Sequence, residues 1–137
     1  MELYEFLKQR VQNAKGYIRF SHLNFVELGE GTAKAEIQVD EDLLNPMGTV
    51  HGGCLFSICD TVGGTAAMTH GVAVTTTMAS ISYLNPAPGK GILTAEAVEL
   101  KAGNNLFRYD VFVRDEQGIL VCKANLEYFK IGQLNYS

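Results

Sequence analysis

Residues 54–69 constrain the fold more than any other segment, because they predict a helix that is apolar on nearly every side. Apolar residues recur at helical spacing along one stripe, and the opposite side carries aromatic and small residues in place of charges. The stripe consists of Leu55, Ile58, Cys59, Val62 and Ala66, and the opposite side of Phe56, Gly63, Gly64 and Ala67. A helix without a polar face belongs in the interior. The rest of the chain must therefore surround it.

The flanking segments predict one amphipathic helix and several β-strands. Residues 2–14 repeat apolar side chains at helical spacing and carry a polar opposite side, as a surface helix does. Segments rich in β-branched and aromatic residues, separated by turn-forming residues, are 17–28, 32–39, 72–83, 92–100, 106–114 and 119–130. We therefore predict an α+β fold in which a curved antiparallel sheet wraps the buried helix. Residues 132–137 are expected to fray.

The composition fits one globular domain over residues 1–137, since 47% of the residues are hydrophobic and the chain is long enough for one core. The formal net charge is -4, and the eleven Lys and Arg residues are scattered, which argues against a nucleic-acid-binding surface. No segment is long and apolar enough to predict a membrane span. The expected partners are small molecules or further copies of the chain.

The cysteine pattern and the N-terminus predict a cytoplasmic protein. Three cysteines without a CxxC pair favour a reducing compartment, and residues 1–5 lack the basic and apolar parts of a signal peptide. We interpret Cys54 and Cys59 as packing residues, although a thiol near a helix N-terminus can act as a nucleophile. His22 and His70 have no partner at metal-ligand spacing, so we interpret both as surface or turn residues and expect no metal ion or other cofactor.

Asp60 is the only formally charged side chain between Asp42 and Lys90, where the average composition would give roughly nine charges. A carboxylate in such a segment needs a partner or hydrogen bonds, and the same surroundings can make it a catalytic base. The alternative is a structural role, in which Asp60 bonds backbone amides or hydroxyls such as those of Ser57 or Thr61.

The tripeptide His51-Gly52-Gly53 precedes the buried helix and offers donors for an oxyanion. The first amides of a helix lack intrahelical acceptors and carry partial positive charge, and glycines allow a substrate to approach closely. The alternative is a tight turn into the helix without a catalytic role. Asp60 follows His51 by nine residues, or about 13 Å along an ideal helix. Either the loop folds back toward Asp60, or a second subunit supplies one half of the site.

An ordered motif, Asn45-Pro46-x-Gly48-x-x-His51-Gly52-Gly53 followed by Asp60, resembles the hotdog-fold thioesterases of the PaaI type, a branch of the 4-hydroxybenzoyl-CoA thioesterase superfamily. The likeness continues into Ser80-Ile81-Ser82-Tyr83-Leu84-Asn85-Pro86-Ala87 and covers about residues 30–130. It implies a hotdog fold and the hydrolysis of an acyl-CoA, with an aromatic or aliphatic acyl group, to free acid and CoA. It also implies a homodimer or a dimer of dimers with active sites at the subunit interface.

The resemblance also implies roles for individual residues. Asp60 matches the general base or nucleophile, and residue order leaves both roles open. The Gly52 amide and Asn45 match groups that polarise the thioester carbonyl, while His51 matches a histidine that orients the thioester or the loop. Because the Asp60 and Gly52 positions are far apart along the helix, we expect them to come from different subunits.

Thr76 matches a hydroxyl that bonds the attacking water, provided that the strand aligns without a gap. A register slip of one residue would put Thr75 or Thr77 in its place. The acyl group cannot be identified from the sequence. The residues expected to contact the substrate, each of which is as well explained by ordinary packing, are Gly53, Met47, Phe56, Met78 and Tyr83.

Two other functions stay open. A hydratase or dehydratase acting on enoyl thioesters would use a histidine and an acid on neighbouring elements, whereas here His51 directly precedes Gly52-Gly53 and the acid is Asp60. A non-catalytic carrier of acyl or aromatic ligands would use the same apolar cleft without turnover.

Overall fold

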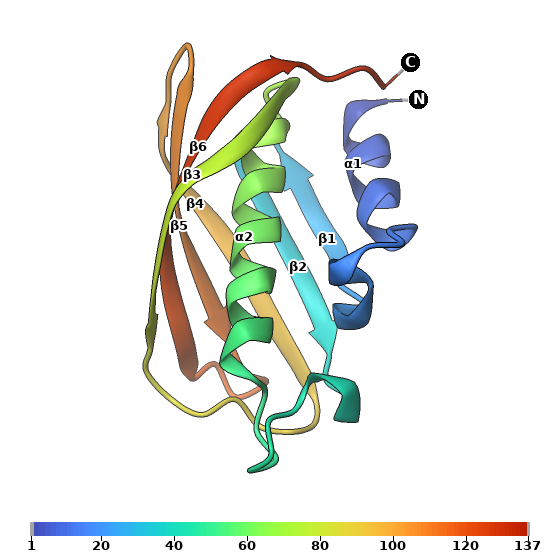
Figure 1. Cartoon of the computed structure of the whole chain (residues 1–137), viewed down its shortest axis with the longest axis vertical. Coiled ribbons are helices and arrows are strands. Elements are labelled where there is room, and N and C mark those ends of the chain that lie inside the picture. The colour runs from blue at the N-terminus through green and yellow to red at the C-terminus, as the bar shows by residue number, and fades with distance from the viewer. Residues whose placement is uncertain (1, 137) are drawn as a thin grey trace.

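The computed structural model describes residues 2–136 and contains a six-stranded antiparallel sheet that curves around helix α2 (Figure 1). The strand order is β1-β2-β4-β5-β6-β3, so β1 and β3 are the edge strands. The elements are α1 (Leu3–Gln12), η1 (Tyr17–Ser21), β1 (Asn24–Gly29), β2 (Thr32–Gln38), η2 (Glu41–Leu43), α2 (Gly52–Met68), β3 (Val72–Tyr83), β4 (Ile92–Ala102), β5 (Leu106–Arg114) and β6 (Leu120–Gln133). The predicted sheet around a central helix is confirmed. No helix within residues 2–136 is long and apolar enough to cross a membrane.

Helix α2 is buried over most of its length, as its apolar sequence predicts. Every residue from Val62 to Met68 is buried, and the inward side chains of β2, β4, β5 and β6 pack against the helix. The helix begins at Gly52, two residues earlier than predicted, because His51 caps it. The Nδ1 atom of His51 accepts a hydrogen bond of 2.8 Å from the Gly53 N–H, which would otherwise lack an acceptor.

Two glycines let α2 approach strand β6. A Cβ atom at Gly63 would lie 2.7 Å from the Tyr128 hydroxyl oxygen and 3.0 Å from Leu126 Cδ1. A Cβ atom at Gly64 would lie 3.3 Å from the Tyr128 ring. Since glycine costs about 1 kcal/mol in a helix relative to alanine, the pair is explained by this close contact between helix and sheet.

The predicted strand over residues 17–28 is wrong in its first half. Residues 17–21 form the 3-10 helix η1, and the strand begins only at Asn24. Ser21 closes the turn between them, because its Oγ donates to the Ile18 carbonyl at 2.8 Å and accepts from the Leu23 N–H at 3.3 Å. His22 adopts a left-handed conformation with φ of 50°. These local side-chain bonds compete with strand pairing.

The C-terminal segment is more ordered than predicted. Strand β6 extends to Gln133, which includes the first part of the segment that was expected to fray. The Leu134 N–H then donates to the Gly71 carbonyl at 3.1 Å. Pairing with β3 therefore holds this segment in place, and Ser137 lies outside the described residues.

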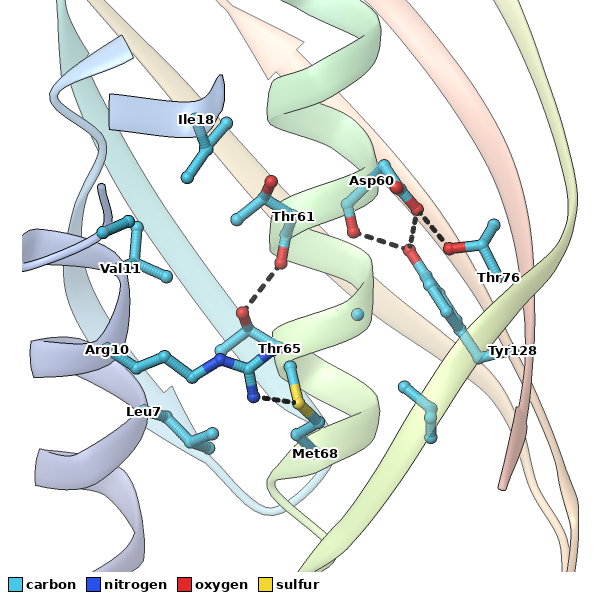
Figure 2. A pocket seen from close by; sticks show the side chains of 13 residues that line it. Leu7, Arg10, Val11, Ile18, Asp60, Thr61, Thr65, Met68, Thr76 and Tyr128 are labelled. Carbon is cyan, nitrogen blue, oxygen red and sulfur yellow. Dashed lines mark hydrogen bonds between the residues drawn. The ribbon is translucent and has the colours of Figure 1, made fainter. Parts of the chain in front are cut away.

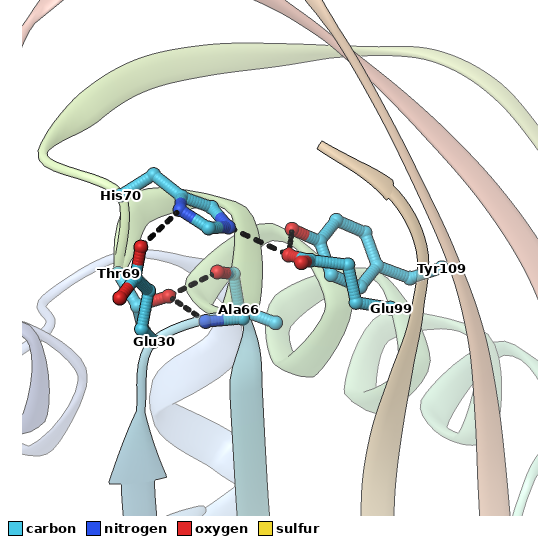
Figure 3. A network of polar contacts seen from close by, with 7 residues as sticks. Glu30, Ala66, Thr69, His70, Glu99 and Tyr109 are labelled. Carbon is cyan, nitrogen blue, oxygen red and sulfur yellow. Dashed lines mark hydrogen bonds and ion pairs between the residues drawn. The ribbon is translucent and has the colours of Figure 1, made fainter. Parts of the chain in front are cut away.

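His70 lies in the turn after α2, as one of the two interpretations of its sequence context expected, but it is more than an ordinary turn residue. Its ring is half-buried, and Nε2 lies 2.6 Å from Glu99 Oε2, which also accepts from the Tyr109 hydroxyl at 2.6 Å (Figure 3). The other ring nitrogen, Nδ1, lies 3.7 Å from Glu30 Oε1. Beside it, the Thr69 hydroxyl accepts from the Gly31 N–H at 2.8 Å. These contacts join the end of α2 to the β1–β2 turn and to β4.

The close contact at Gly63 predicts that Gly63→Ala destabilises the protein, although alanine is the better helix former. The added methyl group must displace the Tyr128 ring, and overpacking of this kind costs about 1–3 kcal/mol against a propensity gain of about 1 kcal/mol. Urea unfolding of both proteins measures the change in the free energy of unfolding.

Gly16→Ala is the matched control, because a Cβ atom there would have nothing within 4 Å. We expect this variant to be as stable as the unchanged protein or more stable. A Gly63→Ala variant that is more stable than the unchanged protein would contradict the close contact.

Candidate active site

Asp60 lies midway along α2 and is half-buried, with its carboxylate held by two hydroxyl groups (Figure 2). The Thr76 hydroxyl on β3 donates to Asp60 Oδ1 at 2.9 Å. The Tyr128 hydroxyl on β6 lies 3.1 Å from the same Oδ1 atom and 2.8 Å from the Asp60 carbonyl oxygen, and can donate to either. Burial and the adjacent negative charge of Asp60 raise the pKa of Tyr128. Tyr128 is therefore a neutral donor at physiological pH.

Hydroxyl groups do hold the Asp60 carboxylate, as the structural alternative expected, but they are not those of Ser57 or Thr61. The Ser57 hydroxyl donates to the Gly53 carbonyl at 2.8 Å, and the Thr61 carbonyl accepts from the Thr65 hydroxyl at 2.7 Å. Among the hydrogen bonds of residues 2–136, none joins Ser57 or Thr61 to the Asp60 carboxylate. The partners of Asp60 come instead from strands that lie far from it in the sequence.

Among the three consecutive threonines of β3, Thr76 is the one that reaches Asp60. The Thr77 hydroxyl bonds to the Glu127 carbonyl at 3.2 Å and to Glu127 Oε2 at 3.0 Å. Sequence reasoning missed Tyr128, which is 68 residues away from Asp60. The alternating pattern of β6 indicates only that Tyr128 faces inward, and the sequence carries no signal for the residue that it meets there.

The loop before α2 is closed by its own hydrogen bonds. Asn45 Oδ1 accepts from the N–H groups of Met47 and Thr49 at 2.9 and 3.2 Å, and Asn45 Nδ2 donates to Thr49 Oγ1 at 2.8 Å. The Asn45 side chain is thus engaged within the loop. It shapes the turn that leads to His51.

The Gly52 amide is the free donor at this helix terminus. His51 occupies the Gly53 N–H, and the amides of Cys54 and Leu55 donate to the His51 carbonyl. For the Gly52 N–H, no acceptor is found among residues 2–136. The Tyr83 hydroxyl donates to the Gly52 carbonyl at 2.7 Å and so holds the next peptide group, between Gly52 and Gly53.

Helix α2 separates Asp60 from the Gly52 amide of the same chain. The helix runs unbroken from Gly52 to Met68, and eight residues correspond to about 12 Å along its axis. The alternative in which the loop folds back toward Asp60 is therefore wrong. One thioester carbonyl cannot contact both groups within a single chain.

A cavity of about 270 Å³ opens beside Asp60, between α1, α2 and the strands β3 and β6 (Figure 2). Besides Asp60 and its two hydroxyl partners, it is lined by Leu7, Arg10, Val11, Ala14, Ile18, Thr61, Gly64, Thr65, Met68 and Val74. The five residues expected from the sequence to contact the substrate are not among them: Gly53, Met47, Phe56, Met78 and Tyr83. The N-terminal helix supplies one wall of this cavity, although its amphipathic pattern indicates only a surface helix.

A second cavity of about 360 Å³ lies between η1, the loop around Leu43 and the first turns of α2, where Cys54 and His51 line it. Burial, and to a smaller extent the charge of Asp40, raise the pKa of the Cys54 thiol to about 11. The thiol is therefore protonated at neutral pH, which agrees with the interpretation of Cys54 as a packing residue.

The comparisons with known proteins point to one family. Residues 47–122 match the model of the thioesterase superfamily. The acyl-coenzyme A thioesterase PaaI of Escherichia coli is 30% identical over 110 residues, which is 80% of this chain and 79% of PaaI. The structure of E. coli PaaI aligns with a TM-score of 0.85 over 96% of this chain and 98% of that chain, at 24% identity.

Two streptococcal structures are similar as well. A hypothetical thioesterase protein from Streptococcus pneumoniae, solved with coenzyme A, has a TM-score of 0.79 and 28% identity over 82% of this chain and 91% of that chain. The protein smu.793 from Streptococcus mutans, bound to acetyl CoA, has a TM-score of 0.80 and 26% identity over 82% of this chain and 91% of that chain. The predicted resemblance and the predicted hotdog fold are confirmed.

The raised pKa of Cys54 predicts slow alkylation at neutral pH. With a pKa of about 11 in place of 9.0, the thiolate fraction at pH 7 falls about a hundredfold. The rate of iodoacetamide addition, followed by intact mass, should rise about tenfold per pH unit up to about pH 11. Cys54→Ser identifies the modified residue. Rapid modification of Cys54 at pH 7 would contradict the assignment and make it a candidate nucleophile.

Proposed function

The chain belongs to the thioesterase superfamily and is a thioester hydrolase, and we propose that it hydrolyses acyl-CoA thioesters at a site shared between two copies of the chain. One observation carries the proposal. The Asp60 carboxylate faces the cavity and the Gly52 amide is unused, but the unbroken helix keeps these two groups of one chain apart. Support for CoA as the leaving group comes from the coenzyme A and acetyl CoA in the two streptococcal relatives.

Asp60 and Thr76 are proposed to act on the attacking water. As general base, the Asp60 carboxylate takes a proton from water while the water oxygen attacks the thioester carbonyl carbon. The Thr76 hydroxyl donates to Asp60 and keeps its lone pairs free, so it can accept a hydrogen bond from the second O–H of the water. Direct attack by the carboxylate to form an anhydride is the alternative for the same residue. The general-base route needs no covalent acyl-enzyme intermediate. The contact between Thr76 and Asp60 supports this route, because it places a hydroxyl where it can help to hold the water.

The Gly52 N–H is proposed to stabilise the oxyanion. It lies at the first position of α2, where the partial positive charge of the helix is concentrated. When water adds, negative charge develops on the carbonyl oxygen, and a fixed N–H donor stabilises this charge. Collapse of the tetrahedral intermediate breaks the C–S bond, and the sulfur leaves as CoA thiolate. The proton that Asp60 took from water balances the charge of this thiolate, and its release returns Asp60 to the carboxylate form.

His51 and Asn45 are proposed to position this donor rather than to contact the reacting atoms. His51 accepts a hydrogen bond from the Gly53 N–H and holds the start of the helix, where Gly52 is then the one amide without an acceptor in the described part of the chain. Asn45 braces the preceding turn through its bonds to Met47 and Thr49.

The second copy is proposed to pair along β3. This edge strand is twelve residues long and carries neither charge nor proline between Val72 and Tyr83. Edge strands that stay unpaired are usually short or protected by charged residues, so this one is suited to pairing. Antiparallel pairing of β3 with its own copy continues the sheet and runs the two α2 helices in opposite directions. The partner's Gly52 amide would thereby come toward Asp60.

Replacing Asp60 tests the chemistry. Asp60→Asn and Asp60→Ala should fold yet lose at least about 10²-fold in kcat/KM, because the base is removed. The readout is free thiol released from short, long and aromatic acyl-CoAs. Asp42→Asn, on an exposed carboxylate outside this cavity, is the matched control and should retain full activity.

The same assay separates the other candidate functions. Loss of enoyl absorbance from crotonyl-CoA without thiol release would show a hydratase. Ligand-induced stabilisation without turnover of any acyl-CoA would show a carrier. Full activity of Asp60→Asn would exclude Asp60 as the base.

Removing the Gly52 amide tests the oxyanion donor. Proline lacks an N–H and is favoured at the first position of a helix, so Gly52→Pro should leave α2 intact. We expect a loss of about 10²–10³-fold in kcat. Gly52→Ala keeps the N–H and should lose much less, since the nearest atoms to its Cβ belong to the exposed Tyr83 ring.

Mixing the two inactive chains tests whether the site is shared. In a dimer of one Asp60→Asn chain and one Gly52→Pro chain, one of the two shared sites contains both native groups. Co-refolding equal amounts should therefore restore about one quarter of the unmutated activity, since about half of the dimers are mixed. If the mixture stays as inactive as its components, each site lies within one chain and the shared arrangement is wrong.

A further inference from the structure

The cavity beside Asp60 contains a second charged group, the Arg10 guanidinium on α1 (Figure 2). In the described chain, Arg10 and Asp60 are the only charged residues among those that line the cavity. Leu7, Val11 and Ile18 supply apolar walls on the α1 side. The cavity is therefore apolar along its walls, with one acidic and one basic group.

Arg10 has no carboxylate partner within residues 2–136. Its one hydrogen bond runs from Nη1 to the thioether sulfur of Met68 at 2.8 Å, a weak acceptor for a charged donor. Burial lowers the pKa of Arg10, and no nearby acid opposes this effect. A guanidinium nevertheless stays protonated in proteins and carries five N–H donors in a planar fork. Its other donors have no protein acceptor within residues 2–136, and the side chain is exposed, so in the free protein these donors face water.

The two charges stand apart along α2. The residues of α2 that line the cavity recur every three or four positions, from Asp60 through Gly64 to Met68, so they form one stripe of the helix. Asp60 and Met68 are eight residues apart, or about 12 Å along the axis. Figure 2 shows the Arg10 side chain crossing from α1 toward Met68 and Thr65, whereas Asp60 points toward Thr76 and Tyr128.

We propose that this cavity accepts the acyl group of a dicarboxylic acid mono-CoA thioester, whose far carboxylate is bound by Arg10 while its thioester carbonyl lies at Asp60. The inference rests on the proposed thioesterase function. Water adds to the thioester carbon, the C–S bond breaks, and the products are the free dicarboxylate and CoA. The far carboxylate takes no part in the bond changes.

Charge complementarity favours a carboxylate over an uncharged end group. A bidentate pair of guanidinium and carboxylate satisfies two of the unused donors at once and is stronger than a bond to a neutral acceptor. The arrangement also separates the anionic end of the substrate from the Asp60 carboxylate, which would repel it. Arg10 is exposed in the free protein, where water can satisfy its remaining donors. A methyl-ended chain that fills the cavity would displace this water without replacing its hydrogen bonds, whereas a carboxylate replaces them.

The test compares substrates that differ only at the far end. Hexanoyl-CoA and adipoyl-CoA have acyl chains of equal length, and octanoyl-CoA and suberoyl-CoA form a second pair. For the unmutated protein, kcat/KM for the carboxyl-ended member of at least one pair should exceed that of the methyl-ended member by at least about tenfold. A preference for the methyl-ended member in both pairs would overturn the proposal.

Arg10→Met removes the charge and keeps an unbranched side chain beside Met68. The ratio of the two kcat/KM values should fall by at least about tenfold. Arg10→Lys, which retains the charge without the planar fork, should keep part of the preference. Arg114→Met is the matched control, because Arg114 is exposed on β5 and its guanidinium bonds only the Gly118 carbonyl within residues 2–136. Its ratio should equal that of the unmutated protein.

An equal loss for both substrates in Arg10→Met would overturn the proposal, since it would indicate a structural role or a contact with the CoA moiety. Binding separates this failure from a failure of the proposed function. Calorimetric titration with the non-hydrolysable thioether analogues of hexanoyl-CoA and adipoyl-CoA needs no turnover. If no acyl-CoA is hydrolysed but the carboxyl-ended thioether still binds at least about tenfold more tightly in an Arg10-dependent manner, the thioesterase assignment fails and the Arg10 site stands.

Discussion

The contact between the glycines of α2 and Tyr128 of β6 is the constraint on which the rest of the site depends. With side chains at Gly63 and Gly64 the helix would have to stand further from the sheet, because a Cβ atom at Gly63 would lie 2.7 Å from the Tyr128 hydroxyl oxygen. At this short separation the hydroxyl reaches both the carbonyl and the carboxylate of Asp60. A packing requirement of the core therefore also fixes the orientation of the candidate catalytic group.

The position of Asp60 between helix and sheet also explains why it survives in an uncharged region. Its carboxylate has hydroxyl donors on the sheet side and an open cavity toward α1, so it is neither unpaired nor fully buried. The N-terminal helix closes that cavity and brings in Arg10. Helix α1, which lies outside the family motif, thus supplies the cavity wall that is proposed to distinguish substrates.

The unbroken course of α2 has two consequences for the proposed site, one that favours catalysis and one that prevents it within a single chain. It gives the Gly52 amide its partial positive charge, and it also holds that amide about 12 Å from Asp60 of the same chain. Strand β3, which carries Thr76, is an uncharged edge strand. In the proposed dimer a second copy pairs with this edge and supplies the Gly52 amide that Asp60 lacks. Catalysis and assembly would then depend on the same strand.

The sequence by itself determined the helix, the strands with alternating burial and the motif from Asn45 to Asp60, because periodicity and glycine placement are local properties. The family and its fold followed from that motif. Sequence patterns did not predict structure that depends on particular side-chain bonds or on distant partners. The hydrogen bonds of Ser21 favour η1 where a strand was expected, and pairing with β3 orders the end of β6. His70 is held by Glu99 and Glu30, which are distant in the sequence. Only the tertiary structure selected Thr76 among three threonines, added Tyr128 beside Asp60, and lined the adjoining cavity with α1 residues such as Arg10. The physical reason is that these contacts join segments far apart in the sequence, and their distances depend on how closely the helix packs against the sheet.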